Sequence, residues 1–116
     1  MFIDFEGYNV RNPKQIHEMT RTVEAIAGPL DHKVYAIVNY ENFTILPELE
    51  EEYAHAVKEL VERFYIDVTR YATSGFLRAK VNSVFEKRNV PAHIFETADQ
   101  ARHGLSAIEP RSGFPA

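Results

Sequence analysis

The chain has 116 residues, a formal charge of −4, no cysteine and an apolar share of 45%, which is typical of one globular domain and too apolar for a disordered chain. The lack of cysteine excludes disulfides, thiolate catalysis and Cys-ligated metals, and it fits a reducing compartment, so we expect a cytoplasmic protein. The acidic balance argues against nucleic acid as a partner, and a membrane partner is not expected because no apolar run reaches the roughly 18 residues of a membrane span.

The first quarter of the sequence predicts one strand and one helix. Residues 2–6 alternate in polarity, which is typical of a short strand. Asn12 can cap a helix that begins at Pro13, with Gln15 at the capping-box position. Gly28 is expected to end this helix as a left-handed cap. The apolar residues at helical spacing are Ile16, Met19, Val23, Ile26 and Ala27.

The second unit carries the clearest helix pattern. Residues 34–40 are almost all apolar and β-branched or aromatic, which indicates a strand covered on both faces. Pro47 opens the next helix, and the glutamates within residues 48–52 favour its start because negative charge meets the positive end of the helix dipole. The expected buried face consists of Leu49, Tyr53, Ala56, Val57, Leu60, Val61 and Phe64.

A third unit follows with the same order. Residues 66–72 predict a strand, after which Thr73 or Ser74 caps a helix. Asn89 is expected to end that helix in the left-handed conformation. Its apolar face consists of Leu77, Val81, Val84 and Phe85.

The last unit is shorter, and it sets the expected domain limits. Residues 92–95 predict a fourth strand, and Thr97 caps a final helix through about Leu105. Residues 106–116 indicate a flexible C-terminal tail. The βαβαβαβα order predicts one α/β domain over residues 1–105, with a mostly parallel four-stranded sheet. Because a strand pattern opens the chain almost at once, we expect it to be a piece of a longer polypeptide.

One candidate ligand site follows the third predicted strand. In open parallel sheets, ligands gather at the carboxyl ends of strands, where helix N-termini also point. Arg70, Thr73, Ser74 and Arg78 can together hold an anion through free N–H groups, hydroxyls and two guanidinium groups, and Tyr71 lies in the same segment. The alternative is ordinary helix capping by Thr73 or Ser74, with both arginines solvated.

A second candidate follows the second predicted strand. Asn39, Tyr40, Glu41 and Asn42 can line a polar cleft. The alternative is a turn whose polar side chains are solvated, with Phe43 folded back on the core. The residues predicted to bind an anion or ligand are therefore Asn39, Tyr40, Arg70, Tyr71, Thr73, Ser74 and Arg78.

The sequence shows no catalytic set and no metal-binding motif, and we expect no cofactor. The histidines lack HxH or HExxH spacing; they are His17, His32, His55, His93 and His103. The glutamates of residues 48–52 lack the apolar neighbours that would split the pKa values of a catalytic pair. A Gly-rich phosphate loop and a GxSxG elbow are also absent. A small enzyme is therefore a less favoured interpretation than a non-catalytic domain or a signalling protein.

Three segments are distinctive: residues 35–43 (YAIVNYENF), 68–80 (VTRYATSGFLRAK) and 92–98 (AHIFETA). Together they resemble the C-terminal region of bacterial acyl-CoA:acetate/3-ketoacid CoA-transferases. The likeness spans most of residues 1–105 and is strongest over residues 70–80. In those enzymes a catalytic Glu of the two upstream transferase domains forms a glutamyl thioester, and nothing in this chain matches its surroundings.

The resemblance implies a non-catalytic accessory domain of acyl-CoA metabolism that acts in docking, oligomerisation or ligand sensing. The partners that it implies are the upstream transferase domains of the same parent chain or another copy of the domain.

The layout is also similar to a STAS domain, the module of sulphate transporters and anti-sigma factor antagonists. In that family a strand leads to a loop with a phosphorylatable Ser or Thr directly before a helix. The equivalent residues 42–47 (NFTILP) lack the Asp-Ser-(Ser/Ala)-Gly pattern, and only Thr44 can stand in. This likeness implies the alternative function, a free-standing STAS-like signalling protein that binds a protein partner.

Overall fold

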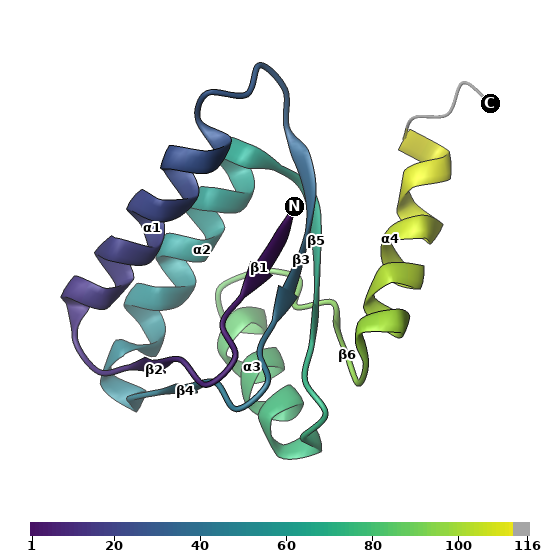
Figure 1. The fold of residues 1–116 in the computed structure, drawn as a ribbon. Coiled ribbons are helices and arrows are strands. Elements are labelled where there is room, and N and C mark those ends of the chain that lie inside the picture. The colour runs from purple at the N-terminus through teal and green to yellow at the C-terminus, as the bar shows by residue number, and fades with distance from the viewer. Residues whose placement is uncertain (113–116) are drawn as a thin grey trace.

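A computed structural model describes the backbone of residues 1–112 and the side chains of residues 1–105. Within these residues, four parallel strands form a central sheet in the order β1-β3-β5-β6 (Figure 1). The strands are β1 (Phe2–Asp4), β3 (Val34–Asn39), β5 (Tyr65–Tyr71) and β6 (Ile94–Phe95). The predicted α/β class and its mostly parallel four-stranded sheet are therefore confirmed.

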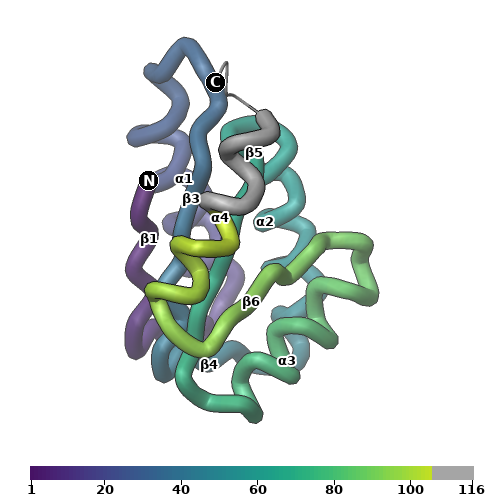
Figure 2. The backbone as a smooth tube through the Cα atoms, turned by 90° about the vertical axis from the view of Figure 1, so that its right-hand side faces the viewer, coloured from purple at the N-terminus to yellow at the C-terminus, as the bar shows by residue number. Residues whose placement is uncertain are grey.

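Helices cover the two faces of the sheet unequally. The helices are α1 (Pro13–Ala27), α2 (Glu50–Phe64), α3 (Gly75–Glu86) and α4 (Ala98–Ser112), and a 3-10 turn, η1 (Pro47–Leu49), precedes α2. In the described part of the chain α1 and α2 lie side by side on one face, whereas α4 lies alone on the other (Figure 1). Seen from the side of α4, β1 runs beside this helix rather than beneath it (Figure 2).

Two short strands were missed by the sequence analysis. β2 (Asn9–Val10) pairs in parallel with β4 (Thr44–Ile45), outside the main sheet. The pair joins the segment that follows β1 to the segment that follows β3. Each strand has only two residues, which is too short for a periodic pattern to reveal.

The hydrophobic core lies between the sheet and the layer of α1, α2 and α3. Alternate residues in the later parts of β3 and β5, together with the residue that follows β5, point into it and are almost fully buried: Ala36, Val38, Val68, Arg70 and Ala72. The predicted face of α3 is buried throughout, whereas Ala56, Val61 and Phe64 of α2 are only partly buried. Ile26 was wrongly assigned to the core, because at the end of α1 it is 56% exposed.

Most helix ends follow the sequence signals. The side chain of Asn12 accepts the Gln15 N–H, and both residues form the predicted capping box. Ser74 rather than Thr73 caps α3, since its Oγ accepts the Leu77 N–H at 3.1 Å. The left-handed prediction is confirmed at Asn89 (φ 59°). It is wrong at Gly28, which is right-handed with φ −57°.

The final helix differs from its predicted length. α4 continues to Ser112, beyond the expected end near Leu105, so the expected tail of residues 106–116 is helical at its start. Residues 113–116 lie outside the described residues. The helix packs closely on the sheet at Gly104, where a Cβ atom would lie 2.9 Å from Phe95 Cζ. Nearby, the Thr69 hydroxyl donates to the Ala101 carbonyl at 2.9 Å.

The buried face of α2 can be tested by truncating Leu60, which is 4% exposed. Leu60→Ala is expected to lower the free energy of unfolding by about 2–5 kcal/mol, because it removes buried methyl groups and leaves a cavity. Denaturant unfolding measures this change. The control is Glu59→Ala on the exposed side of the same helix, which should change stability little. Equal stability of both variants would contradict this packing.

Candidate functional site

The candidate site lies at the carboxyl edge of the sheet, where the loops that follow β1, β3 and β5 meet. The Gly7 N–H donates to the Glu41 carbonyl at 2.8 Å, and the Tyr40 N–H donates to the Tyr71 carbonyl at 2.9 Å. An open cleft of about 670 Å³ lies at this edge. Its lining includes Glu6, Glu41, Thr73, Ser74, Phe76 and Lys80.

A carboxylate of the protein itself occupies the donors that were predicted to bind an anion. Glu41 Oε1 accepts the Thr73 N–H at 2.6 Å, and Oε2 accepts the Thr73 hydroxyl. Hydrogen bonds to an ionised acceptor are stronger than neutral ones. Glu41 therefore ties the loop after β3 to the loop after β5, and it brings negative charge to the place where an anion was expected.

Two other side chains near the start of α3 are hydrogen-bonded within the same turn. Arg78 Nη1 donates to the Ala72 carbonyl at 2.9 Å and to the Thr73 carbonyl at 2.8 Å. Ser74 caps the helix, as described above. The structure thus favours the capping alternative for Ser74, and it gives Arg78 a role in holding the turn.

Arg70 does not reach the cleft, so its assignment to the anion site was wrong. Its side chain is 1% exposed and points into the core. Arg70 Nη1 donates to the Pro91 carbonyl at 3.1 Å and to the Ala92 carbonyl at 2.6 Å. The guanidinium carbon lies 4.6 Å from the centroid of the Phe85 ring, a cation–π contact. The alternation of side chains along the strand could have indicated this burial, because Arg70 lies two residues after buried Val68 and therefore faces the same side.

Tyr40 was also wrongly assigned to a polar cleft. It is 1% exposed, and its hydroxyl lies 2.6 Å from that of Tyr53. Burial raises the pKa of both phenols. Phe43 is folded back on the core beside Tyr40, and Asn42 is left-handed with φ 56°. The turn alternative therefore describes this segment better than the cleft does.

Two predicted residues do lie at the edge, on the sheet face that carries α4. Asn39 pairs with Tyr71 in the register of β3 and β5. Asn39 Nδ2 donates to Glu6 Oε1 at 3.2 Å, and its Oδ1 accepts the Glu41 N–H at 2.8 Å. Burial, followed by the carboxylates of Asp4, Glu41 and Glu6, raises the pKa of Tyr71. These groups make the edge acidic.

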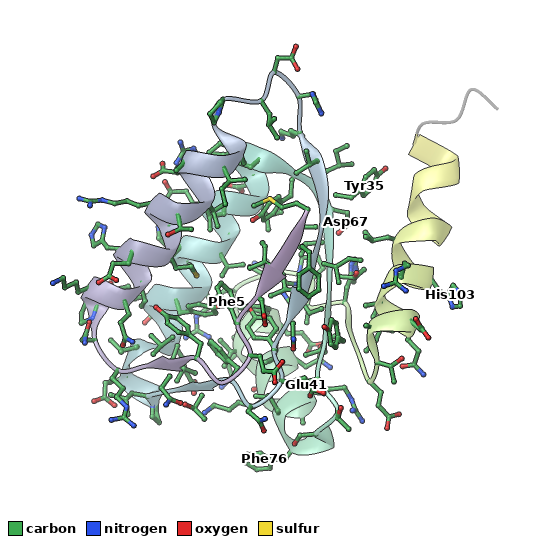
Figure 3. The ribbon with its side chains drawn as sticks, in the orientation of Figure 1. Phe5, Tyr35, Glu41, Asp67, Phe76 and His103 are labelled. Atoms are coloured by element: carbon green, nitrogen blue, oxygen red, sulfur yellow. The ribbon has the colours of Figure 1, made fainter. Side chains whose placement is uncertain are left out.

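Phe76 is the surface residue that the sequence analysis missed. It is 83% exposed in the first turn of α3, and Figure 3 shows its ring pointing away from the sheet, beyond Glu41. The position of Phe76 in the helix could have indicated this exposure, because Phe76 lies outside the apolar stripe that begins at Leu77. The edge therefore presents one bare aromatic ring beside Glu6 and Glu41.

The described residues contain neither a cluster of metal-binding side chains nor a membrane-spanning helix. Among the described side chains, no group of three or more His, Asp or Glu residues is placed to hold a metal ion. No described helix combines the length and the apolar character needed to cross a membrane.

Comparisons of the chain with family models, with curated proteins and with solved structures found no match. The resemblance of residues 70–80 to CoA-transferases therefore stays a prediction from the sequence.

The contact between Glu41 and Thr73 can be measured by a double-mutant cycle. Glu41→Ala removes both hydrogen bonds of the contact, whereas Thr73→Val removes only the bond from the hydroxyl, because the backbone N–H of residue 73 remains. The two changes should be non-additive by about 0.5–1.5 kcal/mol because they share the hydroxyl bond. Denaturant unfolding of both single variants and the double variant gives this coupling energy. Strict additivity would show that the hydroxyl bond does not stabilise the edge.

The buried phenols predict a loss of stability at high pH. Burial raises the pKa of Tyr65 to about 12, and it also raises the pKa of Tyr40 and Tyr53 above the ordinary value of 10.0. Above about pH 10 the unfolded chain therefore releases protons that the folded chain retains, so the free energy of unfolding falls as the pH rises further. Denaturation at about pH 8 and about pH 11 measures the difference, and Tyr65→Phe should reduce it. A constant free energy across this window would contradict the burial.

Proposed function

We propose that the chain is a non-catalytic accessory domain of a bacterial acyl-CoA:acetate/3-ketoacid CoA-transferase and acts in the cytoplasm. It docks through the carboxyl edge onto the transferase domains of the same parent chain. The observation that carries this proposal is the exposure of Phe76, which is 83% exposed on the rim of a cleft whose polar groups bind one another.

The polar side chains of the edge are hydrogen-bonded to other groups of the protein, which gives little support to catalysis or small-ligand binding. Glu41 is bonded to Thr73, Asn39 to Glu6, and Arg78 to backbone carbonyls. A small ligand would have to replace these bonds with equivalent ones, and exchange of one hydrogen bond for another yields little net free energy.

A docking surface fits the same edge well. Binding energy in protein interfaces concentrates on a few large side chains, often aromatic, that enter a pocket of the partner within a polar rim. Phe76 has this exposure, and it lies within residues 70–80, where the resemblance to CoA-transferases is strongest. Because Glu6, Glu41 and Lys80 line the same cleft as the ring, the matching surface of the transferase domains is expected to offer an apolar pocket with charged groups of both signs around it.

The STAS-like signalling function has weaker support. Thr44 lies in β4, and its hydroxyl donates to Asn9 Oδ1. Ile45 and Leu46 separate it from η1, which begins at Pro47. A phosphorylated Thr44 would therefore not stand directly before a helix, as the phosphorylated residue of that family does.

Docking can be tested by titrating the chain into the transferase portion of such an enzyme, prepared without its C-terminal domain, in a calorimeter. Phe76→Ala is expected to raise the dissociation constant at least about 10-fold, because it removes the anchor. The matched control is Ile66→Ala, which removes another exposed apolar side chain, 49% exposed, from the opposite end of β5. It should leave the dissociation constant nearly unchanged.

Two results would contradict the proposal. The first is equal affinity of the parent chain and Phe76→Ala for the transferase portion. The second is transfer of CoA from acetyl-CoA to acetoacetate by the 116 residues alone, since a non-catalytic domain cannot turn over these substrates.

A further inference from the structure

Three buried side-chain atoms lack a hydrogen-bond partner within the described part of the chain: the hydroxyl of Tyr65, the Nε of Arg70 and the Nε of Arg88. The first two belong to residues that line one cavity. Tyr65 is 5% exposed and Arg70 is 1% exposed, so bulk water does not solvate either group. Leaving such groups unpaired is costly, above all for a donor of a charged guanidinium. We therefore expect a hydrogen-bond partner at the place that the two groups share.

A small internal cavity touches both residues. It lies between the sheet and α2, and Tyr40, Val57 and Leu60 also line it. The centre of a water-sized sphere can move within about 20 Å³ of this cavity. One water molecule needs about 10–15 Å³ measured in this way, so the space holds one and not a cluster.

We propose that this cavity is a binding site for one ordered water molecule that bridges Tyr65 and Arg70. The Arg70 Nε–H donates to the oxygen of the water, and the water donates one hydrogen to the hydroxyl oxygen of Tyr65. The Tyr40 hydroxyl is a third partner on the cavity wall, since its bond to Tyr53 leaves it able to make another.

The electrostatics of the cavity favour water over an ion. Arg70 already supplies a permanent positive charge, which excludes a cation. A chloride ion is larger than water, and most of the lining is aliphatic, so the walls offer few donors to hold it. Tyr40, Tyr65 and Arg70 all line this one cavity.

The bridging water would complete the surroundings of the buried guanidinium. Nη1 of Arg70 is bonded to the Pro91 and Ala92 carbonyls, and the ring of Phe85 covers one face. The water would give Nε its partner and link Arg70, near the end of β5, to Tyr65 at its start. Such internal waters act as fixed parts of a structure.

Tyr65→Phe tests this site, because it removes the hydroxyl and keeps the ring. If water bridges the two residues, the variant loses a partner for that water, and the equilibrium constant for unfolding is expected to rise by about 3–30-fold. If the hydroxyl is truly unpaired, its removal relieves a cost, and the constant stays equal or falls. That second result would overturn the proposal.

A crystal structure of the parent chain provides a measurement that does not depend on the variant. The proposal predicts a single solvent peak within hydrogen-bond distance of both Tyr65 Oη and Arg70 Nε. A cavity without such a peak would overturn it. A peak that bromide replaces in a soaked crystal would also overturn it, because that result identifies a halide site.

Discussion

A guanidinium group keeps its positive charge at every pH that a folded protein meets, so the burial of Arg70 places a permanent charge in the core. Its recorded partners are the carbonyls of Pro91 and Ala92 and the ring of Phe85. These contacts join β5 to α3 and to the segment that leads into β6. An unpaired charge at this depth would be strongly destabilising, so the packing of the last two units depends on these contacts.

The arrangement of loops at the carboxyl edge follows from the register of the parallel strands that pack on this core. Because β1, β3 and β5 run in parallel, their loops emerge together, and Glu41 can reach the loop before α3. The loop of one strand thus satisfies the donors at the next helix start, in the place where many α/β proteins bind a phosphate. The exposed ring of Phe76 lies at the rim of this edge.

The periodic part of this arrangement was predictable from the sequence, whereas the pairing of individual side chains was not. The spacing of apolar residues predicts the helices and the sheet class, because the faces of helices and strands that pack on the core are apolar. The alternation of β5 places Arg70 on the same face as buried Val68, but Arg70 and Tyr40 are polar by residue type, and only their tertiary partners explain how such groups are buried. The bond between Glu41 and Thr73 joins two loops far apart in the chain, which no local pattern encodes. The exposure of Phe76 likewise depends on where neighbouring elements end.

Because the two faces of the sheet are covered unequally, α4 and the rest of the fold are expected to differ in the free energy of local opening. Among the described elements only α4 packs on the second face, where Ala101 and Leu105 are buried, Gly104 allows the close approach and Thr69 donates one hydrogen bond. Local opening of a single helix that covers one face costs less free energy than global unfolding. Backbone amides of α4 should therefore exchange with solvent deuterium sooner than those of β3 and β5. The sheet and its first three helices can persist as a smaller folded body while α4 is transiently detached.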